Sequence, residues 1–498
     1  MVQHKACWKG DKMIRETNFE KISGGNQMNS KCNSKHTHRK YSYRQVCEVI
    51  LMVISTVIFA VVWYNFAQDH NITGHLLGTA NLGMAIGIYA VLFVLIGRYL
   101  RAFKIGVDRK MNLIIAQVLT ACIVAFLEVF ISMAITGQFR LFWRLCGIYI
   151  VMAFIQSLAL GIIVVPMINL YRKIFPPIQI LEVYGKYKNG LCDKISGRQD
   201  KYHVAKLMNY KDGMDKVYAQ LDNYDAVLIN DIPGKERNEL LKKCYAMNKR
   251  VYFTPKVSDI IAKSSEELNL FDTPLCLCKN IGISRFQLFW KRFFDILLSG
   301  VALIVLSPIL LIVAIAIHAE DGGPVFFRQE RVTLNGKRFM ILKFRSMIVD
   351  AEKDGRPHPA GEKDDRITKV GAVIRATRLD EIPQLINILK GNMSIVGPRP
   401  ERWEHDEKYT VEVPEWPLRL KVKGGLTGYA QVYGKYNTTA LDKLKLDLFY
   451  ITNYSLVLDI QIIFETVKIV LRKESTEGFT AEKGKEIHDA TTIGESTR

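Results

Sequence analysis

The sequence has few cysteines for its length, nine in 498 residues, and none of them has the C-x-x-C spacing of a metal or redox site. We therefore expect free thiols in a cytosolic or membrane-buried chain rather than a disulfide scaffold. No long apolar run starts within the first 40 residues, so no cleaved signal peptide is expected. Acidic residues are fewer than basic ones, 49 against 68, and the net charge of +19 indicates anionic partners.

Apolar residues make up 49% of the chain, which excludes a mostly disordered protein, and they gather in long runs. Four of these runs are near or above the length that crosses hydrocarbon as a helix: residues 49–66, 76–96, 111–135 and 148–170. They are apolar on every side, so helices of a soluble core are the less favoured alternative. The runs favour a membrane over nucleic acid as the anionic partner, and no nucleic-acid motif is visible.

Basic residues alternate between the connections of these runs. The segment 1–44 and the loop 97–110 are basic, whereas the loop 67–75 has no Lys or Arg. The alternation predicts that the N-terminus and everything after residue 171 are cytoplasmic. Glu128 lies inside the third run, and we expect a protonated or helix-pairing role for it rather than catalysis.

Residues 175–285 have the composition of a soluble module. The pattern predicts a buried strand at 225–229, a helix at 236–247 and a second strand at 251–253, which together indicate a parallel β-α-β unit. The turn at 185–190 lacks the G-x-G-x-x-G pattern of a dinucleotide site. We therefore expect a degenerate Rossmann-like module that serves packing or dimer contact.

A fifth apolar run, residues 296–317, has Ser307-Pro308 at its centre and basic residues on both flanks. Proline removes a backbone donor and bends or breaks a helix, and Ser307 can donate a hydrogen bond to the carbonyl that is freed. Basic residues on both sides disfavour a simple crossing. We expect a re-entrant helix over 289–317 that returns to the cytoplasmic face, with an ordinary kinked spanning helix as the alternative.

The stretch 320–472 sets charged residues beside glycine and proline, and its acidic pair Asp380-Glu381 follows Arg366, Arg375 and Arg378. Carboxylates among arginines suit two tasks, holding a divalent cation and attacking phosphorus, while guanidinium groups match phosphate oxygens. The pair also suits a helix N-terminus, which is itself a favourable place for phosphate.

Several motifs in fixed order are more specific than the pair alone. They are KRFFD (291–295), SP (307–308), GPVFF (323–327), KFRSM (343–347), RIT (366–368) with Gly371, RLDEIPQL (378–385), MSIVGPRP (393–400), GLTGYAQ (425–431) and LD (458–459). In these motifs the chain resembles the bacterial sugar transferase family, the polyprenyl-phosphate phosphoglycosyl transferases. The four runs and the Rossmann-like module in front are similar to its long form.

The resemblance implies transfer of a hexose 1-phosphate from a UDP-sugar to undecaprenyl phosphate with release of UMP, which starts capsule, exopolysaccharide or O-antigen repeat units. It implies Asp380 as the nucleophile that forms a covalent phosphosugar intermediate, and Mg²⁺ held by Glu381 with Asp380. The residues expected to contact substrate phosphates are Lys343, Arg345, Arg375 and Arg399. Asp459 matches a late carboxylate of the family. The chain departs from the family at 434–437.

The expected fold is therefore a membrane helix bundle plus α/β, with a monotopic α/β catalytic domain on the cytoplasmic face of the bacterial inner membrane. The expected domains are a basic tail 1–44, a four-helix transmembrane region 45–172, the Rossmann-like module 175–285, the transferase domain 286–472 and a flexible tail 473–498. We expect the bundle to be dispensable for chemistry, with residues 280–498 sufficient.

Two alternatives stay open. One is a membrane glycosyl transferase that moves the sugar without its phosphate and releases UDP. The other is a non-catalytic scaffold of polysaccharide assembly, which has no need for the acidic pair, the arginines and the Ser-Pro break together. Expected partners are the UDP-sugar, undecaprenyl phosphate, membrane lipid and a second copy in a homodimer, but no nucleic acid. The sequence does not identify the hexose.

Overall fold

In the computed structural model, the described residues are 39–70, 79–137, 139–185, 191–270, 273–278, 282–349, 351, 365–434 and 438–470. The predicted tail 473–498, most of the basic segment 1–44 and residues 435–437 of the departure at 434–437 lie outside them. The chain divides into two compact units, Met1–Thr254 and Pro255–Arg498.

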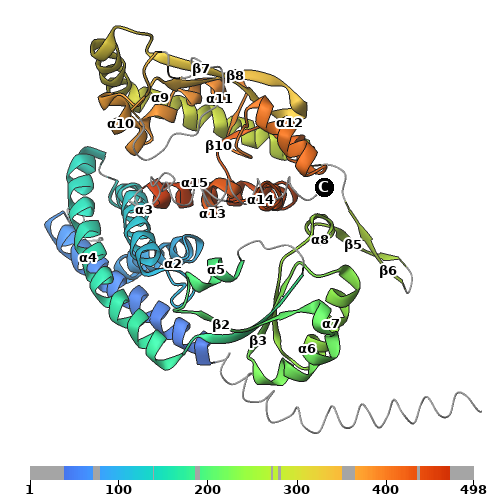
Figure 1. Cartoon of the computed structure of the whole chain (residues 1–498). Helices are drawn as coiled ribbons and strands as arrows, with labels where there is room; N and C mark the ends of the chain where they lie inside the picture. The colour runs from blue at the N-terminus through green and yellow to red at the C-terminus, as the bar shows by residue number, and fades with distance from the viewer. Residues whose placement is uncertain are drawn as a thin grey trace, which may run out of the picture. The chain divides into compact units, whose positions relative to one another are not determined.

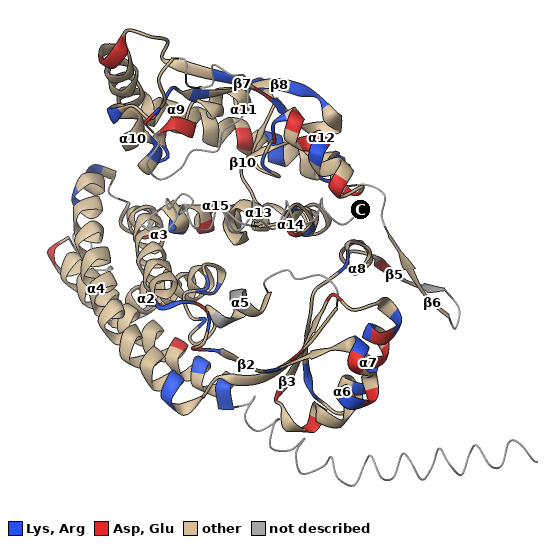
Figure 2. Ribbon diagram, viewed as in Figure 1, with Lys and Arg blue, Asp and Glu red and all other residues tan. Residues whose placement is uncertain are grey.

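The first unit begins with four long apolar helices (Figure 1). They are a helix at Arg39–Asp69, α2 (Thr79–Tyr99), α3 (Lys110–Thr136) and α4 (Phe142–Ile174), the last preceded by the 3₁₀ turn η1 (Phe139–Leu141). Each of the four predicted runs corresponds to one of them. Charged residues are sparse along α2–α4 and lie mainly toward the helix ends (Figure 2). With α9 of the second unit, five helices in the described part are long and apolar enough to cross a membrane, so the chain is a membrane protein.

The core of this helix bundle is aromatic. Phe59 stacks on Tyr89 at 4.2 Å between ring centroids and lies parallel to Tyr149 at 6.3 Å. Tyr149 shares a 2.6 Å hydrogen bond with Ser132, one turn along α3 from Glu128. Glu128 is 1% exposed, and its Oε1 accepts no hydrogen bond from any described residue. The structure thus places this carboxyl inside the bundle rather than toward lipid.

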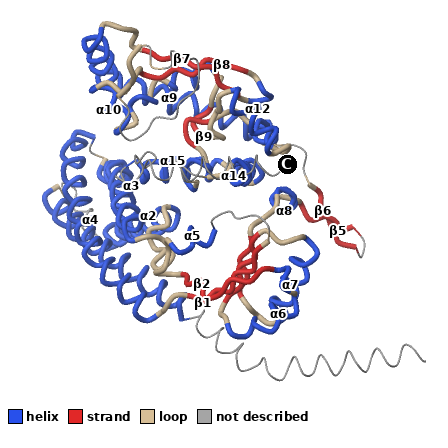
Figure 3. Tube along the Cα trace, in the orientation of Figure 1, coloured by secondary structure: helices blue, strands red, loops and turns tan. Residues whose placement is uncertain are grey.

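A parallel sheet of order β2-β1-β3-β4 follows the bundle (Figure 3). Its strands are β1 (Ile178–Tyr184), β2 (Tyr202–Asn209), β3 (Ala226–Asn230) and β4 (Arg250–Phe253). Its helices are α5 (Leu191–Ser196), α6 (Met214–Gln220) and α7 (Gly234–Ala246). The β3-α7-β4 unit confirms the predicted β-α-β, and β3 pairs parallel with β4.

The sheet is covered on both faces, as parallel sheets are. Val217 of α6 and Leu240 of α7 pack with Val227 on one face, and Leu191 of α5 packs with Ile180 on the other. This accounts for the fully buried run of β3 that the sequence showed as a continuous apolar segment.

The second unit is built around one long helix, α9 (Arg285–Asp321). Before it come α8 (Val257–Lys263) and the hairpin β5 (Glu266–Leu270) and β6 (Thr273–Leu277). After it come β7 (Phe326–Val332), β8 (Arg338–Phe344), α10 (Lys369–Ala376), η5 (Leu379–Glu381), α11 (Gln384–Lys390), β9 (Ser394–Val396), α12 (Trp403–Glu412), η6 (Trp416–Lys421), β10 (Gly425–Thr427), α13 (Tyr429–Tyr433), α14 (Ala440–Thr452) and α15 (Leu456–Val470).

Helix α9 continues through Pro308 without interruption. Pro308 has no N–H to offer the carbonyl of Ile304, and the Ser307 hydroxyl donates to that carbonyl at 2.8 Å. The predicted hydrogen bond of Ser307 is therefore confirmed. Most of the central apolar side chains of α9 remain exposed, as a lipid-facing helix requires.

Both ends of α9 bind to the same domain. Near its start, Arg292 donates to the carbonyls of Ile388 and Leu389 at 2.5 and 2.7 Å. At its end, the carboxylate of Glu320 accepts from the backbone N–H groups of Lys369 and Val370 at 2.7 and 3.2 Å. The carbonyls that accept from Arg292 belong to α11, and the N–H groups that donate to Glu320 belong to α10. These two helices are separated by only a few residues in the chain.

Candidate active site

The acidic pair lies in a tight turn between two helices. Asp380 and Glu381 form the end of η5, and Pro383 stands immediately before α11, so the pair lies just before a helix N-terminus rather than in its first turn. Arg378, which precedes η5, has a φ of +59°. A non-glycine residue in this left-handed region costs on the order of 1 kcal/mol, and such strain is typical of functional turns.

Glu381 is held by two cations from different elements. Lys343, near the end of β8, donates to its Oε1 at 2.7 Å, and Arg399, just after β9, donates to the same oxygen at 3.0 Å. Burial alone would raise the pKa of Glu381, but Arg399 and Lys343 outweigh it and hold this pKa well below its usual range. Glu381 is therefore ionised at neutral pH, and its two cations fix its orientation.

Asp380 has a different environment. Its carboxylate makes no hydrogen bond or ion pair with any residue in the described part of the chain, although the side chain is partly buried. Burial, and then the charge of Glu381, raise the pKa of Asp380, while Lys343, Arg378 and Arg375 oppose the rise. A carboxylate without partners and with a raised pKa is more nucleophilic than a clamped one.

A small pocket adjoins this pair. It is lined by Arg331, Ile341, Lys343, Gln384, Arg399, Pro400 and Gly425. Three of these residues are cations, and among the described residues only Glu381 forms ion pairs with Lys343 and Arg399. Burial and then the charge of Arg399 lower the pKa of Arg331 to about 10, so it stays protonated at neutral pH. The surplus positive charge suits an anion such as a diphosphate.

Glycines bring the walls of the pocket together. Strands β9 and β10 pair in parallel, and a Cβ on Gly425 would lie 2.1 Å from the backbone nitrogen of Gly397. Only glycine permits this approach. The GPRP and GLTG motifs are therefore adjacent because their backbones touch, which sets the position of Arg399.

A buried ion pair lies behind Arg399. Arg419 and Asp447 are each 1% exposed and are joined at 2.8 Å, and Arg419 also donates to the carbonyl of Arg399 at 2.8 Å. Glu401, two residues beyond Arg399, is bonded to Lys443. Although burial opposes the shift, Lys443 and Arg419 lower the pKa of Glu401 to about 2.

The structure assembles only part of the predicted set. Lys343, Arg399, Asp380 and Glu381 come together, and Arg375 in the last turn of α10 acts on Asp380 through its charge. Arg345 does not line the pocket. The strand β8 ends at Phe344, and Arg345 turns away to pair with Asp321 at the end of α9.

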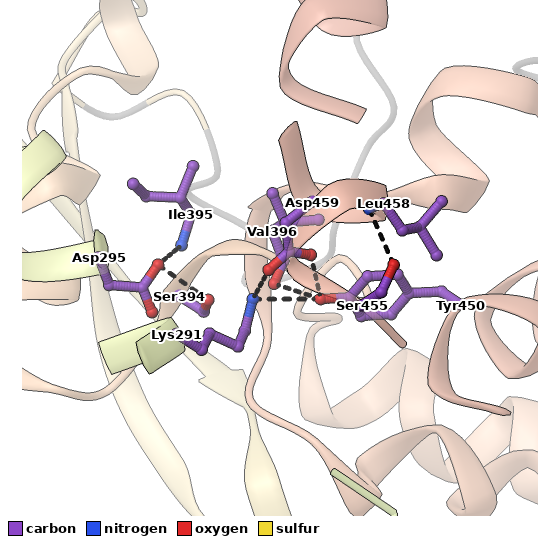
Figure 4. Close-up of polar contacts among 9 residues, drawn as sticks. All are labelled: Lys291, Asp295, Ser394, Ile395, Val396, Tyr450, Ser455, Leu458 and Asp459. Atoms are coloured by element: carbon purple, nitrogen blue, oxygen red, sulfur yellow. Dashed lines mark hydrogen bonds and ion pairs between the residues drawn. The ribbon is translucent and has the colours of Figure 1, made fainter. Parts of the chain in front are cut away.

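Asp459 lies in a second buried cluster (Figure 4). Its carboxylate binds Lys291 of α9 at 2.7 Å and accepts from the Tyr450 hydroxyl at 2.7 Å. Asp295, one turn along α9, accepts from Ser394 and from the backbone of Ile395 in β9. This cluster joins the first half of α9 to α15 and β9, so Asp459 has a positional role here.

Sequence reasoning missed five residues around the pair: Arg331, Gln384, Glu401, Arg419 and Asp447. Three of them gave a signal. Gln384 lies inside the motif RLDEIPQL, Glu401 directly follows the GPRP motif, and Arg331 lies seven residues after Pro324 in a stretch noted only for its basic flank. Arg419 and Asp447 gave none, because they pair with each other across 28 positions of the chain.

The described residues contain no group of three or more His, Cys, Asp or Glu side chains able to enclose a metal ion. Mg²⁺, however, commonly uses one or two protein carboxylates together with substrate phosphates. Asp380 has no hydrogen-bond or ion-pair partner among the described residues, and Glu381 binds its two described cations through Oε1. The pair therefore fits a cation that binds together with a phosphorylated ligand.

Fold and site together define a membrane-bound protein whose α/β domain places a carboxylate pair beside a cationic pocket. The model of the bacterial sugar transferase family matches residues 286–473. A UDP-glucose:undecaprenyl-phosphate glucose-1-phosphate transferase of Caulobacter vibrioides is 39% identical over 191 residues, which cover 37% of this chain and 71% of that protein. The chain belongs to the bacterial sugar transferase family.

Two further relatives extend beyond the matched domain. A protein of the same description from Klebsiella pneumoniae is 36% identical over 332 residues, 63% of this chain and 66% of its own length. A UDP-N-acetylgalactosamine-undecaprenyl-phosphate N-acetylgalactosaminephosphotransferase of Aeromonas hydrophila is 36% identical over 265 residues, 52% of this chain and 62% of its own length. The chain thus aligns with about two thirds or less of these two proteins, whose names give different sugars.

Proposed function

We propose that this chain transfers a hexose 1-phosphate from a UDP-sugar to undecaprenyl phosphate, releases UMP and so starts a polysaccharide repeat unit at the cytoplasmic face of the bacterial inner membrane. The observation that carries the proposal is the contrast within the acidic pair. Glu381 is clamped by Lys343 and Arg399, whereas Asp380, beside the same cationic pocket, makes no hydrogen bond or ion pair within the described chain.

In the first step, a carboxylate oxygen of Asp380 attacks the β-phosphorus of the UDP-sugar. The bond from that phosphorus to the bridging oxygen breaks, and UMP leaves with the bridging oxygen. In the second step, an oxygen of the lipid phosphate attacks the same phosphorus, the bond to Asp380 breaks and the carboxylate is restored. Lys343, Arg399 and Arg331 stabilise the charge on the phosphate oxygens in both steps.

Mg²⁺ is the cofactor that we propose for the pair, with Glu381 and Asp380 as its protein ligands. When bound, it would neutralise phosphate charge and favour the departure of UMP. The protein's own contribution is orientation. Because Glu381 is fixed by two cations at a single oxygen, its other oxygen is held in a constant direction.

The proposed location depends on α9. Its two ends bind α11 and α10 of one compact domain through Arg292 and Glu320. A straight helix of 37 residues would extend about 55 Å, enough to carry its ends across a bilayer. Shared contacts at both ends therefore support a re-entrant helix that bends near Ser307-Pro308 and holds the pocket close to the lipid phosphate.

The test is an incubation of the full chain with a panel of UDP-sugars, undecaprenyl phosphate and Mg²⁺, in which the released nucleotide and lipid-soluble sugar are measured. We expect UMP, and we expect Asp380→Asn to lower transfer by about a thousandfold or more. Asp215→Asn, at an exposed position of the sheet module, is the matched control and should retain full transfer.

Two outcomes would contradict the proposal. Release of UDP would indicate a glycosyl transferase, and full activity of Asp380→Asn would exclude this side chain as the nucleophile. Mass spectrometry of the protein quenched before lipid is added should find a phosphosugar on Asp380 and nowhere in the Asp380→Asn variant.

A further inference from the structure

A boundary between membrane and water runs through the first unit. The helix Arg39–Asp69 begins there, and α4 ends at Ile174, four residues before β1 begins at Ile178. Aromatic rings gather at this level, with Tyr43 and Tyr171 at 5.6 Å and Tyr171 and Phe175 at 4.8 Å between centroids. Aromatic side chains are enriched where hydrocarbon meets headgroups.

Basic residues from three parts of the chain come together here: the start of the first helix, the turn before β2 and the start of β4. We call them the boundary cluster: Lys40, Arg44, Arg198, Lys201 and Arg250. The charges of Arg250, Arg44 and Lys201 act on the Lys40 ammonium. The charges of Arg198 and Arg44 act in turn on the Lys201 ammonium. The cluster is therefore one electrostatic site rather than scattered surface charge.

Nearby carboxylates are largely engaged with other partners. Asp200 binds Arg172 at 2.8 Å and Arg198 at 3.0 Å, and Asp108 binds Arg101 at 3.1 Å. Asp225, which also acts on Lys40, is exposed and accepts from the backbone N–H of Gln179 at 3.1 Å. Positive charge consequently remains in excess.

Two ammonium groups of the cluster make no hydrogen bond or ion pair within the described chain. Lys40 lies over the ring of Phe175 at 5.7 Å, and Lys201 lies over the ring of Tyr202 at 4.8 Å. Burial lowers the pKa of Lys201, and the charges of Arg198 and Arg44 add to the shift. Partly buried cations that repel one another are stabilised when an anion binds between them.

We propose that the boundary cluster binds the phosphate group of an anionic phospholipid, with Lys40 and Lys201 as its main contacts. The aromatic residues Tyr43, Tyr171 and Phe175 place the site at headgroup depth. The site is separate from the acidic pair of the second unit and does not depend on the proposed transfer reaction.

The position of the cluster on the sheet favours a lipid over a soluble nucleotide. Lys201 directly precedes β2 and Arg250 begins β4, so the cluster lies at the amino ends of parallel strands. Soluble ligands of open parallel sheets bind at the carboxyl ends of the strands instead. The amino ends of the strands lie beside two membrane helices. A phosphate that binds there therefore belongs to the headgroup of a membrane lipid.

The experiment measures the affinity of the full chain for phosphatidylglycerol in mixed micelles, from the rise in unfolding temperature relative to phosphatidylcholine. Each basic residue near an anionic surface contributes about a factor of five in affinity. We therefore expect Lys40→Gln/Lys201→Gln to bind about thirtyfold more weakly, and Lys40→Arg/Lys201→Arg to retain the affinity.

The matched control is Lys104→Gln/Lys173→Gln, which removes the same charge from exposed positions at the same end of the bundle. Equal losses in the two double glutamine variants would overturn the proposal, because surface charge alone would then explain binding. So would equal stabilisation of the unmodified chain by inorganic phosphate, which would identify a soluble anion. If Lys40→Gln/Lys201→Gln is unstable in phosphatidylcholine, the single variant Lys201→Gln provides the comparison. An unchanged affinity of Lys201→Gln for phosphatidylglycerol would then overturn the proposed lipid site.

Discussion

At the scale of single residues, the second unit separates its ionised groups by partner. Glu381, Glu401 and Asp447 are each bound to cations, whereas Asp380, beside the pocket, forms no ion pair in the part of the chain that the structure describes. Buried charges are tolerated when they are paired, and an unpaired one persists where a ligand is to supply the partner. The chemistry that we propose thus depends on Asp380 having no cation bound to it, more than on the number of carboxylates near the pocket.

Glu401 gives a prediction about stability against pH. Its pKa in the folded protein is about 2, against an ordinary value of 4.5, a depression worth roughly 3 kcal/mol. A depressed carboxyl stabilises the fold fully above its unfolded pKa, and this stabilisation is lost as the pH falls from about 4.5 toward 2. Glu401→Gln should therefore lower the free energy of unfolding by about 3 kcal/mol at neutral pH and by much less near pH 2.

The measurement is denaturant unfolding in detergent at several pH values. Glu412→Gln, an exposed position on α12, is the control and should change stability by about 0.5 kcal/mol or less at every pH. A Glu401→Gln deficit that stays constant with pH would contradict the assigned ion pair with Lys443.

At the scale of elements, α9 connects the membrane to the site. Asp295 holds the start of β9, Arg292 holds the end of α11, and Arg345, just after β8, pairs with Asp321 at the end of the helix. A shift of α9 would therefore move the segments that carry Lys343 and Arg399. This explains why Arg345, a predicted phosphate ligand, is better placed as a link between helix and strand.

Pro308 and Ser307 can be separated by experiment. Pro308→Ala restores the N–H that the carbonyl of Ile304 lacks, removes a penalty of about 3 kcal/mol for a straight helix, and so should admit a spanning form. Ser307→Ala loses only one hydrogen bond, worth about 1 kcal/mol, and should keep the re-entrant form.

The readout is labelling of a cysteine placed at the exposed Lys337, in a chain without its native cysteines, by a membrane-impermeant maleimide added outside the cell. Labelling should rise in Pro308→Ala and stay low in Ser307→Ala. Strong labelling at position 337 when Pro308 and Ser307 are unchanged would place the acidic pair on the outer side of the membrane. This result would contradict the re-entrant helix.

At the scale of the whole molecule, the division after Thr254 assigns α8 to the unit that contains the site. Ile260 of α8 is 1% exposed and packs in the same core as Leu444 and Leu448 of α14. The predicted minimal fragment 280–498 lacks α8. The predicted boundary at 285 had placed this helix in the preceding module, so its removal was not expected to affect the transferase domain.

We therefore expect the fragment 255–498 to unfold at a clearly higher temperature than 280–498. The loss of Ile260 alone costs about 2–4 kcal/mol, which corresponds to a shift of several degrees. Ile260→Ala in the full chain should reproduce most of the deficit. Equal unfolding temperatures of the two fragments would show that α8 contributes nothing to the transferase core.

The sequence by itself determined what depends on local pattern. Run length and hydropathy located the four apolar helices, apolar continuity located β3 and β4, and fixed spacing located Asp380, Glu381 and the Ser307-Pro308 pair. These features depend on residues that are close in the chain, where periodicity and backbone chemistry act directly.

Only the tertiary structure decided how the charges are shared. Lys343 and Arg345 are two residues apart, yet one clamps Glu381 and the other pairs with Asp321. Asp459 finds Lys291 across 168 positions, and Arg419 finds Asp447 across 28. Such pairs are set by the packing of distant segments against one another, because an ion pair requires a few ångströms of proximity that local sequence does not encode.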